Sequence, residues 1–109
     1  MKYKVCILAA GIGSRMKPFT EHINKSLLPV NFKAVISHII EKFDTNIEIV
    51  VAVGHLKETV IDYLDCAHKD RKFTIVDVDR FTGKGSGPGY SLMQCRDHLD
   101  LPFVFFASD

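Results

Sequence analysis

Apolar residues fall into four short runs, residues 3–8, 47–53, 73–78 and 103–107, that are enriched in Val, Ile and Phe. These runs mostly lack polar alternation, which is typical of strands buried on both faces of a parallel sheet. Between them, apolar residues recur at helical spacing over 34–43 and 57–66. A third helix is predicted over 88–99, with Gly87 as N-cap and Pro88 at the first helical position, where its missing N–H costs nothing. The pattern predicts the order β-α-β-α-β-α-β.

Right-handed crossovers turn this order into an α/β, Rossmann-like, doubly wound and mostly parallel sheet with helices on both faces. The simplest arrangement is a three-layer α/β/α fold with strand order 3-2-1-4, counting the four runs along the chain. Ligands in such sheets bind beyond the carboxyl ends of the strands where the winding reverses, here between strands 1 and 4. The last run is typical of a central strand, yet nothing follows it to cover its free edge. We therefore expect residues 1–109 to be a truncated part of a longer protein.

Composition narrows the classes of partner. A chain of 109 residues with net charge +1 holds at most one domain, and no window carries a dense Lys/Arg cluster. This argues against nucleic acid and against an anionic membrane surface. The apolar run 5–10 is too short for a secretory signal, and no run approaches the roughly 20 residues that cross a bilayer. The expected location is cytoplasmic.

The cysteines and histidines give no sign of a metal or redox site. Cys6, Cys66 and Cys95 lie in separate predicted elements without a C-x-x-C pattern, so we interpret them as core residues. No histidines stand at metal-ligand spacing, and the interpretation is that three of them are helix residues: His38, His68 and His98.

The glycine-containing loop after the first strand is the strongest candidate for chemistry. Glycines there let backbone N–H groups approach a phosphate. A dinucleotide fingerprint is disfavoured, because Met16 stands at its third glycine position and the second strand ends in Val53-Gly54-His55 without an acidic residue. A P-loop is excluded because no Gly-Lys-Ser/Thr follows. The excursion from residue 11 to about 33 instead contains Arg15 and Lys25, two cations that suit a triphosphate.

These residues carry a family resemblance. The stretch LAAGIGSRMKPFT (8–20), followed by KSLLPV (25–30), resembles the signature LAAGxGTR-(L/M)-x-P-(L/F)-T and PK-x-L-(L/V)-P-(V/I) of the sugar-phosphate nucleotidyltransferases. It is also similar to the phosphocholine-type cytidylyltransferases. The likeness continues more loosely through VVAVGHLKETVIDYL and GPGYSL to FVFFASD, so it covers the whole chain.

The resemblance implies transfer of a nucleotidyl group from an NTP to a sugar 1-phosphate or similar phospho-alcohol, with release of pyrophosphate. Arg15 and Lys25 would be the catalytic cations. Asp109 would bind Mg²⁺ as the cofactor. The nucleotide would be bound by Leu8, Ala10, Gly11, Gly13, Ser14 and Gly87. Residues 1–109 would then be the nucleotide-binding amino-terminal portion of a nucleotidyltransferase domain, itself inactive or incomplete.

The sequence departs from the family pattern at two places. Asn24 stands where the family usually has proline, which is expected to loosen the turn before Lys25. The base-contacting glycine segment fits either as Gly87-Pro88-Gly89 or as Gly85-Ser86-Gly87, and no glutamine stands upstream, only Asp77, Asp79 and Arg80. The base and the acceptor therefore stay open. So do a non-catalytic nucleotide-binding or regulatory module and a phosphocholine-type cytidylyltransferase, whereas a dinucleotide-dependent oxidoreductase is disfavoured.

Overall fold

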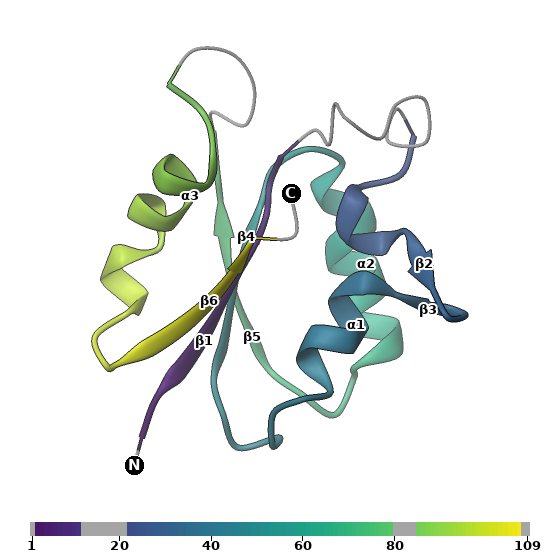
Figure 1. The fold of residues 1–109 in the computed structure, drawn as a ribbon, viewed down its shortest axis with the longest axis horizontal. Coiled ribbons are helices and arrows are strands. Elements are labelled where there is room, and N and C mark those ends of the chain that lie inside the picture. The colour runs from purple at the N-terminus through teal and green to yellow at the C-terminus, as the bar shows by residue number, and fades with distance from the viewer. Residues whose placement is uncertain (1, 12–21, 80–84, 108–109) are drawn as a thin grey trace.

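The computed structural model describes residues 2–11, 22–79 and 85–107, and a four-stranded parallel sheet lies at its centre (Figure 1). Its strands are β1 (Lys4–Ala9), β4 (Ile49–Val53), β5 (Phe73–Asp77) and β6 (Phe103–Ala107). Their order is β5-β4-β1-β6, and each neighbouring pair is parallel. This confirms the predicted sheet and the predicted order 3-2-1-4.

In the described part of the chain, three α-helices cover the two faces of the sheet. α1 (Val35–Ile40) and α2 (Lys57–Ala67) lie on one face and α3 (Pro88–Gln94) on the other, so the three-layer prediction is confirmed (Figure 1). α3 is shorter than the predicted helix and is followed by a separate 3-10 turn, η3 (Arg96–His98). No helix among the described residues is both long enough and apolar enough to cross a membrane.

The two inner strands divide the core between the faces. Successive side chains of a strand point to opposite faces, so alternate residues of β1 and β4 enter different clusters. One cluster joins them to α1 and α2 and contains Val5, Ile7, Ala9, Ile36, Ile40, Ile49, Val51, Val53, Val60 and Leu64. The other joins them to the α3 side and contains Cys6, Leu8, Ala10, Val50, Ala52, Val78 and Cys95.

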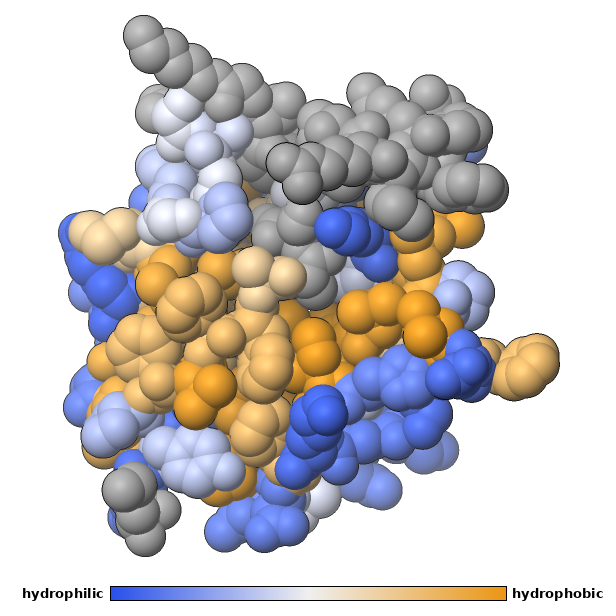
Figure 2. Space-filling model, viewed as in Figure 1, coloured by the Kyte–Doolittle hydropathy of each residue, from blue (hydrophilic) through white to orange (hydrophobic). Residues whose placement is uncertain are grey.

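The outer strands are not buried on both faces, which corrects the expectation for residues 73–78 and 103–107. β5 and β6 are the edges of the described sheet, and most of their residues are partly or well exposed. Phe103, Val104 and Phe105 are 39%, 46% and 51% exposed. Figure 2 shows apolar side chains gathered on the face where Figure 1 places β6. Continuous apolar runs therefore mark the parallel strands, but they do not tell an inner strand from an edge strand.

The described part of the excursion after the first strand contains regular structure that the sequence pattern missed. It contains a 3-10 turn, η2 (Lys25–Leu27), and an antiparallel hairpin of β2 (Pro29–Val30) and β3 (Lys33–Ala34). The two turn residues, Asn31 and Phe32, have φ of 52° and 66°, and the Phe32 side chain is fully exposed. Turns of this kind favour Asn-Gly, so the Phe in the second position concealed the hairpin.

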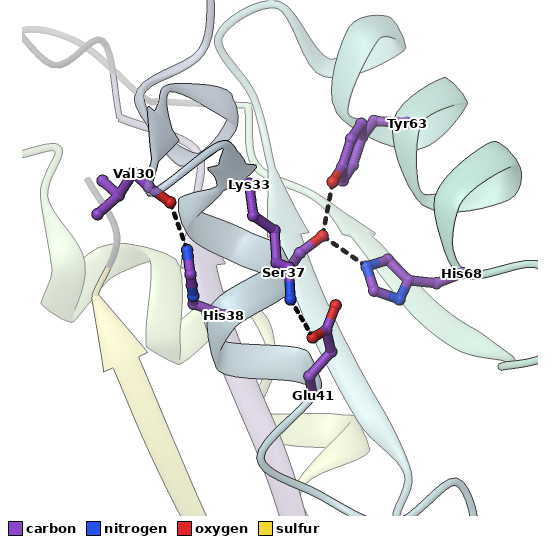
Figure 3. Close-up of polar contacts among 7 residues, drawn as sticks. All are labelled: Val30, Lys33, Ser37, His38, Glu41, Tyr63 and His68. Atoms are coloured by element: carbon purple, nitrogen blue, oxygen red, sulfur yellow. Dashed lines mark hydrogen bonds and ion pairs between the residues drawn. The ribbon is translucent and has the colours of Figure 1, made fainter.

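A small polar network ties α1 to α2 (Figure 3). Ser37 Oγ lies 2.6 Å from Tyr63 Oη and 2.7 Å from His68 Nε2. On the other side of α1, His38 Nε2 lies 2.6 Å from the Val30 carbonyl oxygen, which fastens the hairpin to the helix. Burial of the His68 ring lowers its pKa. His38 lies in α1 and His98 in η3, which agrees with their interpretation as helix residues, whereas His68 stands just after α2 as its C-cap.

Candidate functional site

The candidate site lies at the carboxyl end of β1, where the winding of the sheet reverses. The chain leaves β1 for β4 through α1 on one face and returns to β6 from α3 on the other face. In register, Ala9 pairs with Val53 of β4, and Leu8 pairs with Ala107 of β6. The loop after β1 therefore starts between β4 and β6, in the position where ligands bind to doubly wound sheets.

The predicted nucleotide-binding residues at the carboxyl end of β1 differ in solvent exposure. Leu8 and Ala10 are completely buried in the core cluster beneath α3, main chain included. Gly11 is partly exposed directly after them. The other predicted residues of this loop, Gly13, Ser14 and Arg15, and the predicted metal ligand Asp109 lie outside the described residues. Their roles stay predictions.

Lys25, the second predicted cation, starts the η2 turn and follows a residue tied to the sheet. The Asn24 side chain is 1% exposed and donates from Nδ2 to the carbonyl oxygens of Ala9, at 3.0 Å, and His55, at 2.7 Å. Its Oδ1 accepts from Ser26 N at 2.9 Å and from Ser26 Oγ at 2.7 Å. Lys25 is thus placed, by its backbone, next to the carboxyl ends of β1 and β4.

The expectation that Asn24 loosens this turn is wrong. Both hydrogens and the oxygen of its amide have partners, and its backbone has φ −62° and ψ 139°, a conformation that proline itself adopts. Asn24 also serves as the N-cap of η2. The residue that replaces the usual proline therefore keeps the proline backbone conformation and adds hydrogen bonds that a proline lacks.

His55 is joined to the site through its main chain. Its N–H donates to the Ala10 carbonyl oxygen at 2.9 Å, and its own carbonyl oxygen accepts from Asn24. These bonds extend the contact between β1 and β4 beyond the last strand pair. These contacts give His55 a structural role in the turn after β4.

Gly87, the predicted base-contacting residue, lies at the start of α3 and has φ +130°. An added Cβ at Gly87 would meet no atom within 4 Å, so the backbone conformation rather than space requires glycine. Pro88 occupies the first turn of α3, as predicted. Gly85 also has positive φ, at 86°. Both possible alignments of the glycine segment stay predictions.

Sequence reasoning missed a hollow of about 540 Å³ beside the carboxyl ends of β4 and β5. Its lining consists of Gly54, Lys57, Glu58, Asp77, Val78 and Asp79. Lys57 Nζ lies 2.6 Å from Asp77 Oδ2, and this hydrogen bond raises the pKa of Lys57. Asp79 Oδ1 accepts from Tyr90 Oη at 2.6 Å, which links the end of β5 to α3. The available signal was the pair of carboxylates, Asp77 and Asp79, at the carboxyl end of this strand.

The cysteines agree only in part with their interpretation as core residues. Cys6 and Cys95 are buried, but Cys66 is exposed because it lies on the outer side of α2. A hydrogen bond with the Cys95 thiol, together with burial, raises the pKa of Cys6. A raised pKa disfavours the thiolate that a nucleophile requires. Among the described residues, no three His, Cys, Asp or Glu side chains are grouped so that they could hold a metal ion.

Comparison with known proteins identifies the family. Residues 5–109 match the family model of the MobA-like NTP transferase domain. The choline-phosphate cytidylyltransferase of Streptococcus pneumoniae is 46% identical over 108 residues, which are 97% of this chain and 44% of that protein. The UTP–glucose-1-phosphate uridylyltransferase AglF of Haloferax volcanii is 30% identical over 105 residues, or 94% of this chain and 42% of that protein.

A solved structure agrees with the fold. The CTP:phosphocholine cytidylyltransferase LicC of Streptococcus pneumoniae superimposes with a TM-score of 0.82 at 32% identity, over 100% of this chain and 46% of that chain. The chain spans less than half the length of each of these relatives. Because the family model covers almost the whole sequence, the chain belongs to the MobA-like NTP transferase domain family.

Proposed function

We propose that this chain is the nucleotide-binding amino-terminal portion of a nucleotidyltransferase domain. The protein would transfer a nucleotidyl group from an NTP to a sugar 1-phosphate or a similar phospho-alcohol. An oxygen of the acceptor phosphate would attack the α-phosphorus, and the bond from that phosphorus to the bridging oxygen of the β-phosphate would break, so that pyrophosphate leaves. A phosphomonoester has its second pKa near about 6 and needs little help from a base. Repulsion between negative charges is therefore the main obstacle.

One observation carries this proposal: Gly11 and the segment that bears Lys25 both lie at the carboxyl end of β1, where Asn24 ties that segment to Ala9. In the proposed mechanism, backbone N–H groups of Gly11, Gly13 and Ser14 receive phosphate oxygens. Arg15 binds the β- and γ-phosphates through its planar guanidinium, and Lys25 places a point charge near the α-phosphate.

Further roles complete the proposal. Gly87 would let backbone approach the base, and the buried Leu8 and Ala10 would support the nucleotide site from the core beneath it. Asp109 would hold Mg²⁺, which neutralises phosphate charge when bound and takes its remaining ligands from phosphate and water. Asp109 stands two residues after β6, the strand that pairs with β1. We also propose a cytoplasmic location.

Pyrophosphate release by the full-length protein, measured with a panel of triphosphates, sugar 1-phosphates and phosphocholine, tests the proposal. Release with at least one pair is expected, and Lys25→Ala and Arg15→Ala should each slow it by about a hundredfold without changing the melting temperature. If a triphosphate binds but no acceptor reacts, the protein is a regulatory nucleotide-binding module. Near-normal rates in either variant remove that residue from the mechanism.

The 46% identity to a choline-phosphate cytidylyltransferase favours a second candidate acceptor. In that case CTP and phosphocholine would react in the same panel and the sugar 1-phosphates would not. The mechanism at the α-phosphorus would be the same, because both acceptors attack through a phosphate oxygen.

A further inference from the structure

The side chain of Asn24 has the contacts of a residue that fixes one part of a site against another. It is 1% exposed and lies between three segments that are distant in the sequence. Its Nδ2 reaches the carbonyl oxygen of Ala9, 15 residues away, and that of His55, 31 residues away. Its Oδ1 holds the first turn of η2 through Ser26. Lys25 lies between Asn24 and Ser26 in the sequence.

From these contacts we propose that Asn24 is a positioning residue for Lys25, holding its backbone against the carboxyl ends of β1 and β4. This inference rests on the proposed function only where it predicts that a misplaced Lys25 slows the reaction. A proline at position 24 would restrict φ but has no side-chain donor. Here two donated and two accepted hydrogen bonds keep the same backbone conformation and add a link to the sheet.

Asn24→Asp isolates the link to the sheet. The aspartate has the same shape and keeps the acceptor for Ser26, but it loses the Nδ2 donors and sets a carboxylate oxygen against the carbonyl oxygens of Ala9 and His55. Ser26→Ala is the matched control, because it removes one bond to Asn24 and leaves both bonds to the sheet. A misplaced catalytic group can lower the rate by up to about a hundredfold.

The first measurement needs no activity. Acetic anhydride labels lysine amines, and mass spectrometry of the full-length protein gives the labelling rate of Lys25, with the exposed Lys33 as internal reference. We expect Asn24→Asp to change the Lys25 rate relative to Lys33 at least about threefold and Ser26→Ala to leave it unchanged, since only the aspartate loses the bonds to the sheet. An unchanged ratio in a folded Asn24→Asp variant overturns the inference.

The second measurement is a double-mutant cycle on kcat for pyrophosphate release. Asn24→Asp should lower kcat about tenfold or more in the wild-type background and less than twofold in Lys25→Ala, because coupled residues are non-additive. Equal fold-losses in both backgrounds would mean that Asn24 only supports the fold, and the inference would be wrong. If Lys25→Ala itself has normal turnover, the proposed function fails, and the labelling ratio alone decides the role of Asn24.

Discussion

Phe32 stands in a backbone conformation that glycine adopts more easily, so Phe32→Gly should stabilise the protein. Its φ of 66° places an L-residue in the left-handed region, which costs roughly 1–2 kcal/mol for a residue with a Cβ. The ring is fully exposed, so its removal sacrifices no burial. Glycine also raises the entropy of the unfolded chain, which offsets about 0.4–1 kcal/mol of this gain. The expected net gain in the free energy of unfolding is about 0.5–1 kcal/mol.

Urea unfolding of the full-length protein measures this gain. With a slope of about 2 kcal/mol per molar urea, the unfolding midpoint should rise by roughly 0.3–0.5 M. Phe32→Ala is the matched control, because it also removes the ring but keeps the Cβ that causes the strain. The midpoint of Phe32→Ala should therefore stay near that of the wild type. A rise as large in Phe32→Ala as in Phe32→Gly would refute the backbone argument, as would a lower midpoint in Phe32→Gly.

Three further predictions concern other parts of the chain. Gly87→Ala should lower the thermal midpoint because it places a Cβ on a residue with φ +130°. Gly89→Ala is the control and should not lower it, because Gly89 lies at the start of the same helix, has no positive φ and has open space for a Cβ; equal midpoints in the two variants would contradict this account. Burial lowers the pKa of His68 below its usual value near 6.5, so the neutral ring's contribution to stability is fully present above about pH 6.5 and is lost as the pH falls below that value. The urea midpoint should therefore drop less between pH 7.5 and 5.5 in His68→Gln than in the wild type, and an equal drop in both proteins would disprove this account. The ion pair of Lys57 with Asp77 is largely exposed, so Lys57→Met should leave the urea midpoint unchanged within error, and a clear loss would show that the pair is structurally important.

The helical and strand patterns predicted the framework because they reflect local burial. Val60 and Leu64 of α2 lie one helical turn apart on one side and are buried, as the spacing required. The same local pattern could not distinguish β4 from β6. Both are continuous apolar runs, but only β4 has a neighbouring strand on each side in the described sheet.

By itself, the sequence determined the alternation of strands and helices, the strand order of a right-handed doubly wound sheet, and the glycine and lysine motif after the first strand. These features follow from nearby residues and from the handedness of crossovers, which is almost invariant. Only the tertiary structure decided what Asn24 does, because its partners Ala9 and His55 are far away in the sequence and come together through strand pairing. In the sequence Asn24 is a polar residue of a loop, but in the fold its side chain is buried at the carboxyl end of the sheet. A buried amide requires hydrogen-bond partners, and only the fold supplies them.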